Sequence, residues 1–170
     1  MKFEIDAAIE EMNRKISELD SIKDKKEWFI AYKSIINEYS YIMDSPETIY
    51  DCFTEEDLDF LFHVVQAEVG DEYSFEQKAN VANVIFCRLA HERFPNTLLE
   101  ILTPDQFQPI ANGSYKTVVV SENTILACEY AFQIGIDTEE CLFFDSNNTL
   151  NYQFVFNDNA HNFYKYREEK

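Results

Sequence analysis

The stretch TEEDLDFLFHVVQAEVGDEYSFEQKANVANVIFCR, residues 54–88, carries the patterns that decide the fold. Thr54 is followed by three acids, which is typical of a helix start, because an oxygen-bearing side chain caps the first N–H groups and acids favour the positive end of the helix dipole. Apolar residues then recur at three- and four-residue spacing, at Leu58, Leu61, Phe62, Val65 and Val69. We predict a helix that begins after Thr54 and packs one apolar face against a core.

Glu68 falls on or beside this apolar face, three residues after Val65, and Gly70 should end the helix within two residues. An acid held against apolar side chains favours its neutral form, so its pKa rises toward the value that a general acid near neutral pH requires. The spacing alone leaves a second reading open, in which a Glu near a helix end turns toward solvent.

A second buried helix should follow, because Ser74 and Gln77 form a capping-box pattern. Its apolar face comprises Val81, Ala82, Ile85, Phe86 and Leu89. The prolines of residues 94–96 and 103–104 then delimit a short turn, which we expect Asn96 to cap.

Two apolar stripes precede this region and predict an N-terminal helical hairpin. One comprises Ile5, Ile9, Met12, Ile16 and Leu19, and the other Trp28, Phe29, Tyr32, Ile35, Ile36, Tyr39 and Ile42. Asp44-Ser45-Pro46 should break the helix, since proline pushes the preceding residue out of helical geometry. We therefore predict a hairpin domain at 1–46 and a second domain at 47–170. The hairpin either caps the second domain or binds a protein partner.

Residues 104–116 lack periodicity and contain two prolines and an Asn-Gly turn, so we predict an irregular loop that is either a sugar-binding wall or a plain connector. Ser121 should cap a further helix that ends before Gly135. Three strands, at 141–144, 152–156 and 161–166, should form a small antiparallel sheet. The predicted fold class is α+β, mainly helical, with this sheet near the C-terminus.

The composition bounds the function. The 170 residues are 46% hydrophobic, enough for one ordinary domain with a small appendage. A net charge of −18 argues against binding to nucleic acid or to anionic membrane, each of which needs a basic face. The N-terminus lacks the apolar run of an export signal, and no stretch has the length of a membrane span, so we expect synthesis in the cytoplasm without a signal peptide.

No metal or cofactor site is expected. The cysteines, Cys52, Cys87, Cys128 and Cys141, are far apart and should be buried thiols. Asp145, Asn147 and Thr149 have calcium-loop spacing, but Leu150 stands where that loop needs glycine, so we reject calcium there.

Six short motifs occur in a fixed order between about residues 54 and 166. They are QAE at 66–68 followed by Glu72, VANVIFCR at 81–88, RFPNT at 93–97, QFQPIANG at 106–113, LFF at 142–144 and HNFY at 161–164. Together they resemble the SleB/CwlJ-type spore cortex-lytic cell-wall hydrolases. The chain departs from that pattern at Cys87, where the family usually has asparagine, and at Gly70, which stands two residues before Glu72 and not one.

The resemblance implies a lysozyme-like catalytic domain that acts on peptidoglycan glycan strands, with Glu68 as the catalytic acid. In this family the reaction is thought to be that of a lytic transglycosylase, which ends in a 1,6-anhydro-muramic product. We expect substrate-binding residues at Glu72, Gln106, Phe107, Asn112, Tyr115, His161 and Tyr164. Glu72 either orients substrate or water or caps the helix after Ser74. His161 either contacts substrate or closes the sheet through hydrogen bonds.

The leading hypothesis is thus a peptidoglycan lytic transglycosylase or muramidase. Without a signal peptide it would act on the cell wall as a phage lysin, a virion-associated hydrolase or a spore enzyme. The alternative is a non-catalytic phage or spore structural or wall-binding protein that keeps the groove and uses its hairpin for assembly.

Overall fold

The computed structural model describes residues 2–42, 47–134 and 141–167. The chain divides into two compact units, one up to Glu47 and one from Thr48 onward. The predicted break at Asp44-Ser45-Pro46 lies outside the described residues, as does Gly135, which was predicted to follow the end of the helix after Ser121.

The first unit is a helical hairpin, as predicted. Helix α1 (Lys2–Glu18) leads through a short 3-10 helix, η1 (Leu19–Ser21), into helix α2 (Lys25–Glu38). Met12, Leu19, Ile35 and Tyr39 form its buried cluster. Helix α2 begins earlier than its apolar stripe because the Asp24 carboxylate accepts a hydrogen bond from the Glu27 backbone N–H. It ends at Glu38, so Ile42 packs on the cluster from the turn that follows.

The second unit is mainly helical. Its helices are α3 (Ile49–Cys52), α4 (Glu55–Glu68), α5 (Phe75–Ala90), α6 (Leu98–Ile101), α7 (Gln108–Asn112), the 3-10 helix η2 (Ser114–Lys116) and α8 (Glu122–Gln133). Thr54 caps α4 and Ser74 caps α5, each within a reciprocal capping box, which confirms both predicted starts. Ser121 likewise caps α8.

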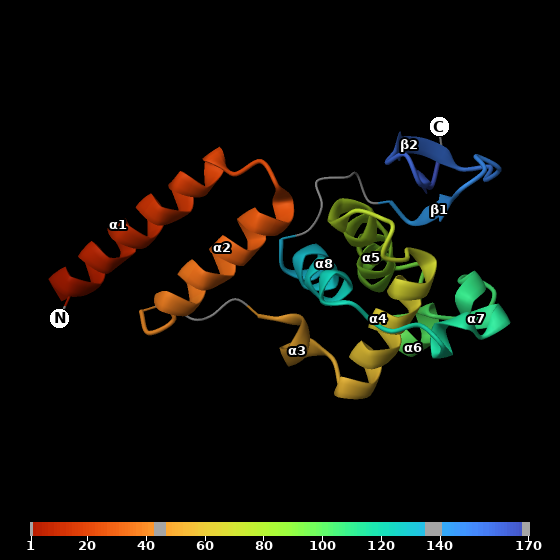
Figure 1. Ribbon diagram of the computed structural model, residues 1–170, viewed down its shortest axis with the longest axis horizontal. Coiled ribbons are helices and arrows are strands. Elements are labelled where there is room, and N and C mark those ends of the chain that lie inside the picture. The colour runs from red at the N-terminus through yellow and green to blue at the C-terminus, as the bar shows by residue number, and fades with distance from the viewer. Residues whose placement is uncertain (1, 43–46, 135–140, 168–170) are drawn as a thin grey trace. The chain divides into compact units, whose positions relative to one another are not determined.

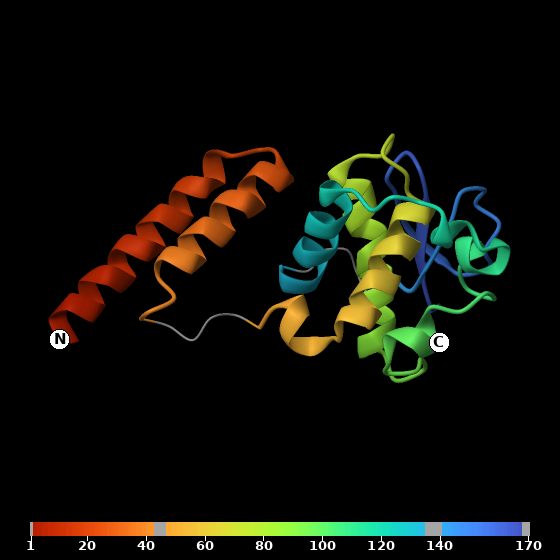
Figure 2. The same cartoon turned by 60° about the horizontal axis from the view of Figure 1, so that its bottom comes forward.

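The core of this unit lies where α4, α5 and α8 meet. Figures 1 and 2 show α5 between α8 and the C-terminal strands. The predicted faces of α4 and α5 are buried in one cluster with α6, α8 and Phe107. Leu61, Val65, Val81 and Ile85 are fully buried within it. This packing fixes the direction of α4 and hence the position of its last residue, Glu68.

The segment 104–116 is more ordered than predicted, because it contains α7 and η2 in place of an irregular loop. Pro109 lies in the first turn of α7, where a missing N–H costs no intrahelical hydrogen bond. Gly113 ends α7 with a φ of 79°, a left-handed conformation that glycine adopts without strain. The expected Asn96 cap is also wrong, since Thr97 precedes α6.

The C-terminal strands form the predicted antiparallel sheet. Strands β1 (Phe143–Asp145), β2 (Gln153–Asn157) and β3 (Asn162–Lys165) have the order β1-β3-β2. Phe144 pairs with Phe163, and a register shift between Phe154 and Phe156 interrupts the pairing of β2 with β3. The sheet packs on α5 through a cluster of Val84, Cys141 and Phe163.

Two of the four cysteines match the prediction of buried thiols. Cys128 and Cys141 are buried, Cys87 is half-buried and Cys52 is exposed. Cys52 was wrongly predicted because α3 is a single turn that buries Ile49 and leaves its end at the surface. Within the described parts of the chain, no helix is long and apolar enough to cross a membrane.

We expect Thr54→Ala to lower the free energy of unfolding by about 1 kcal/mol, because it removes the cap of the helix that carries Glu68. Thr97→Ala is the matched control, since the Thr97 side chain makes no capping hydrogen bond. Urea denaturation monitored by circular dichroism measures both. Equal losses from the two substitutions would contradict a capping role for Thr54.

Candidate active site

Glu68 is the last residue of α4 and lines a cavity of about 260 Å³. The other lining residues come from the α7 region and from the sheet. They are Gln106, Gln108, Phe144, Asp145, Ser146, Asn147 and His161. The cavity therefore joins two carboxyl groups to amides, a hydroxyl and an imidazole, which suits a polar ligand with many hydroxyl groups.

Burial raises the pKa of Glu68 to about 7, against the lowering effect of a hydrogen bond from the Gln108 backbone N–H. The half-buried side chain is thus partly protonated at neutral pH. Such a carboxyl group can give a proton in one step and take one back in the next. Of the two sequence readings, the structure supports the one in which Glu68 faces a desolvated site.

Asp145 lines the same cavity in the opposite electrostatic state. Desolvation raises its pKa, but hydrogen bonds from the Thr149 backbone N–H and hydroxyl, from the Tyr164 hydroxyl and from the Asn148 N–H outweigh this and lower the pKa to about 2. The Tyr164 hydroxyl donates to Oδ1 at 2.8 Å, and the Thr149 hydroxyl donates to Oδ2 at 2.8 Å. Asp145 is therefore a fixed carboxylate at neutral pH.

His161 is buried at the cavity wall, and its Nδ1 has no hydrogen-bond partner among the described residues. Its ring lies against Tyr73 and edge-on to Phe144, at centroid distances of 6.1 and 5.3 Å. Burial lowers its pKa, against the raising effect of Asp158 and Asp145, so the ring is neutral. His161 therefore forms part of the cavity wall as a neutral ring, while its Nδ1 is buried.

Glu68, Gln106 and His161 are the predicted site residues that the structure brings together at the cavity. Tyr164 is buried and reaches the site indirectly, because its hydroxyl binds the Asp145 carboxylate. Phe107 is fully buried in the core, where its ring lies 6.3 Å from that of Phe144. Its predicted substrate contact is therefore wrong, because a core side chain cannot touch a ligand.

Glu72, Asn112 and Tyr115 do not line the cavity. Glu72 lies over Gly70, where an added Cβ would stand 2.3 Å from the Glu72 Oε2 atom. The Asn112 side chain accepts a hydrogen bond from the Ser114 N–H at 2.9 Å, which closes the turn after α7. The Tyr115 ring packs on Phe60 with a centroid distance of 5.2 Å. The predicted substrate contacts of these three residues find no support in the cavity.

Sequence reasoning missed the acidic turn after β1. Asp145 was weighed only as a calcium ligand, and the described residues hold no group of three or more His, Cys, Asp or Glu that could bind a metal ion. The pattern that could have revealed it is an Asp followed by Asn and Thr, because such residues form turns in which the carboxylate accepts backbone N–H groups. Asp145 accepts N–H bonds from Asn148 and Thr149 in this way.

A second cavity, of about 450 Å³, is larger but chemically poorer. Its lining is Tyr50, Phe53, Glu55, Leu58, Asp59 and Phe62. Its surface is mainly apolar, and it contains neither the amides nor the imidazole of the Glu68 cavity. We therefore take the smaller, polar cavity as the candidate active site.

Comparison with known proteins identifies the family of the chain and solved structures of similar fold. Residues 72–168 match the family model of cell wall hydrolases. The fold is similar to the catalytic domain of the germination-specific lytic transglycosylase SleB from Bacillus anthracis, with a TM-score of 0.60 and 21% identity over 69% of this chain and 100% of that one. The catalytic domain of SleB from Bacillus cereus gives 0.58 and 23% over 66% and 92%. No curated protein sequence matches the chain.

The raised pKa of Glu68 predicts a pH-dependent cost in stability. Since folding favours the protonated form, the stabilisation is present below the unfolded pKa of about 4.5 and is lost as pH rises through about 7. Relative to Glu68→Gln, wild type should lose up to about 3 kcal/mol of unfolding free energy between about pH 4 and pH 8. Because the Glu68 side chain is only half-buried, screening by water should keep the loss below this limit.

Urea denaturation of both proteins across this pH range measures the difference. Asp145 and His161, the other titratable groups at the cavity, are present in both proteins, so their contributions largely cancel. A difference that does not change with pH would show that Glu68 titrates as an ordinary solvated carboxyl group.

Proposed function

The chain belongs to the cell wall hydrolase family, and we propose that it cleaves peptidoglycan glycan strands between N-acetylmuramic acid and N-acetylglucosamine as a lytic transglycosylase. The observation that carries the proposal is Glu68, a carboxyl group with a pKa of about 7 at the wall of a polar cavity. The family model begins at residue 72, so the catalytic role of Glu68 rests on the geometry and not on that match.

Glu68 can serve as both acid and base in such a reaction. As the neutral acid it protonates the glycosidic oxygen, and the bond from that oxygen to the anomeric carbon of the muramic sugar breaks. The resulting carboxylate then takes the proton from the C6 hydroxyl of the same sugar. The C6 oxygen attacks the anomeric carbon and closes the 1,6-anhydro ring, which returns Glu68 to its protonated state.

A pKa close to ambient pH suits this double task, because neither protonation state of Glu68 is then strongly disfavoured. The C6 hydroxyl is already held near the anomeric carbon, so it has an entropic advantage over water as the attacking group. The lytic transglycosylase activity named for the Bacillus anthracis neighbour adds support for this product.

The other cavity residues suit binding of a sugar. Gln106, Gln108 and Asn147 offer amides that can both donate and accept hydrogen bonds. The neutral His161 ring forms part of the wall beside these amides. With a net charge of −18, the protein gains no general electrostatic attraction to anionic wall polymers, so shape and hydrogen bonds must hold the glycan.

A muramidase is the second candidate, and Asp145 is the observation that favours it. The carboxylate lines the cavity of Glu68 and stays ionised, so it can stabilise a positively charged anomeric carbon or attack it as a nucleophile. Two carboxyl groups in contrasting protonation states are the arrangement that glycoside hydrolases use. Glu72, the acid nearest to Glu68 in the sequence among the predicted site residues, does not line the cavity and so gives no such second carboxyl group.

We expect Glu68→Gln to abolish clearing in a zymogram on purified peptidoglycan, with at least a 100-fold loss of activity, because the amide keeps the shape of the side chain but gives no proton. Glu72→Gln is the matched control and should retain activity. Clearing by Glu68→Gln at the wild-type level would remove Glu68 from the mechanism, and an inactive wild type would support the non-catalytic wall-binding alternative.

Digestion of glycan strands should yield 1,6-anhydro-muropeptides, which mass spectrometry identifies through their loss of one water relative to hydrolysis products. Asp145→Asn should lower the rate and leave this product unchanged, since the C6 hydroxyl still attacks. Products with reducing-end muramic acid, together with an inactive Asp145→Asn, would instead assign a two-carboxylate muramidase.

A further inference from the structure

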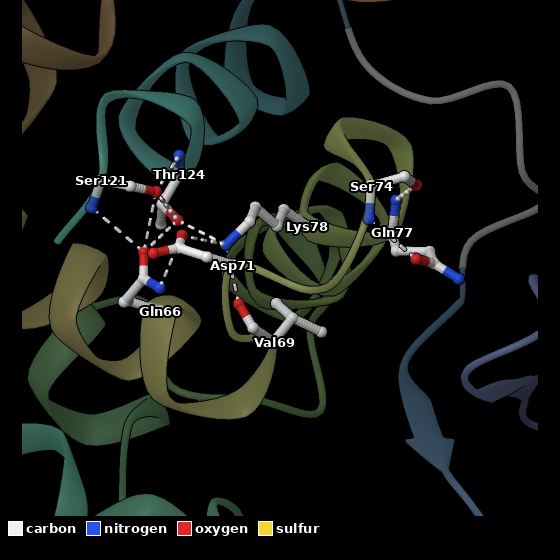
Figure 3. Close-up of polar contacts among 8 residues, drawn as sticks. All are labelled: Gln66, Val69, Asp71, Ser74, Gln77, Lys78, Ser121 and Thr124. Carbon is white, nitrogen blue, oxygen red and sulfur yellow. Dashed lines mark hydrogen bonds and ion pairs between the residues drawn. The ribbon is translucent and has the colours of Figure 1, made fainter. Parts of the chain in front are cut away.

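Lys78 is a buried cation that the proposed mechanism does not use. It lies in the first turns of α5, and its side chain is 0% exposed. Its Nζ donates hydrogen bonds to the Val69 carbonyl at 2.8 Å and to the Thr124 hydroxyl at 2.9 Å, and it stands 3.6 Å from the Asp71 carboxylate. Figure 3 shows the Lys78 side chain reaching these three groups, and it shows Gln66 nearby, bonded to Ser121, Thr124 and Asp71.

The burial of this ammonium group is costly. Burial lowers the pKa of Lys78, and the Asp71 carboxylate that opposes the shift is itself 68% exposed. A weakly paired buried charge seldom adds stability over an apolar side chain of the same size. The contacts of Lys78 therefore point to a role other than packing.

The Val69 carbonyl places Lys78 beside the catalytic acid in the chain. Val69 directly follows Glu68 and is the C-cap of α4. The last carbonyls of a helix have no intrahelical partner, and a cation is favourable at this negative end of the helix dipole. The Val69 N–H donates to the Val65 carbonyl at 2.9 Å, so hydrogen bonds hold both polar groups of Val69.

Gln66 holds the same helical turn from the other side. Its Oε1 accepts hydrogen bonds from the Ser121 N–H at 3.1 Å and hydroxyl at 3.0 Å, and also from the Thr124 hydroxyl. Its Nε2 donates to Asp71 at 3.1 Å. Lys78 and Gln66 thus tie the end of α4 to α5 and α8 (Figure 3). In the sequence Glu68 lies between Gln66 and Val69, the two residues that these bonds hold.

We propose that Lys78 is a positioning residue, whose grip on the Val69 carbonyl fixes the end of α4 so that the Glu68 carboxyl group stays in its desolvated place at the cavity. This inference rests on the proposed acid role of Glu68, but its physical content is the burial of Glu68 and not the reaction. A favourable position needs both a fixed backbone and a fixed side chain, and a displacement of about 1 Å can cost 100-fold in rate.

The decisive measurement does not require activity. The unfolding free energy of the protein with Glu68 is compared with that of the Glu68→Gln variant across the pH range, and the change in this difference with pH is recorded. The comparison is made once with Lys78 present and once in the Lys78→Met background. If Lys78 holds Glu68 in place, the difference should fall to less than half in the Lys78→Met background, because a displaced carboxyl group regains water and its pKa falls.

The sign of the change separates positioning from electrostatics. Loss of a nearby positive charge alone would raise the pKa of Glu68 and enlarge the pH-dependent difference. Asp145 and His161, the other titratable groups at the cavity, and the Gln108 N–H that donates to Glu68 remain in every variant. A difference that is unchanged or larger in the Lys78→Met background would overturn the proposal.

Enzyme kinetics provide a second test of the positioning role. Lys78→Met should lower kcat at least 10-fold with little change in KM and shift the basic limb of the pH profile to lower pH. Ile35→Val, a mild change in the buried cluster of the N-terminal hairpin and outside this network, is the control and should leave the pH profile in place. If Lys78→Met does not fold, Lys78→Leu, which also lacks a hydrogen-bond donor, takes its place with the same criteria.

An inactive wild type would end the proposed function and leave the stability measurement to decide the role of Lys78. A kcat and pH profile of the Lys78 variant equal to those of the Ile35→Val control would overturn the positioning role, even if Glu68→Gln is inactive.

Discussion

The desolvation of one carboxyl group at the end of a helix is the constraint on which the rest of the second unit depends. Glu68 is held with a pKa of about 7 because α4 packs its apolar face on α5 and α8 and ends at the cavity wall. The capping box at Thr54 sets where that helix begins, and the hydrogen bonds on Val69 fix where it ends. The packing that stabilises the core therefore also disfavours the charged form of Glu68.

The cavity is chemically asymmetric because its two carboxyl groups come from different kinds of structure. Glu68 stands at a helix end and accepts a hydrogen bond from the Gln108 backbone N–H, whereas Asp145 begins a turn that surrounds its carboxylate with donors. Tyr164, on β3, adds its hydroxyl to that set and so connects the sheet to the cavity. In the proposed reaction, proton transfer and charge stabilisation are thus divided between a helix and a sheet.

Sequence patterns predicted what short-range physics determines. The starts of α4, α5 and α8 follow from side chains that cap N–H groups two or three residues ahead, and the buried faces follow from regular spacing.

The cavity was harder to predict, because it joins Glu68 to Asp145 and His161, which are distant in the chain. Lys78 gave no signal, since a lysine between Gln77 and Asn80 resembles a solvated residue, and its burial depends on α8. Helix α7 was missed because Pro109 and Gly113 were interpreted as breakers and not as its two ends.

The turn at Asp145 also bears on how such an enzyme can diversify. Its carboxylate is held by the N–H groups of Asn148 and Thr149, by the Thr149 hydroxyl and by Tyr164, so Ser146 and Asn147 carry none of these bonds although they line the cavity. Those two positions can accept new side chains while the charge beside them stays in place. Selection for differently modified glycans could therefore act on Ser146 and Asn147 separately from the residues that hold the acid, so that preference for substrate and rate of cleavage evolve as independent traits.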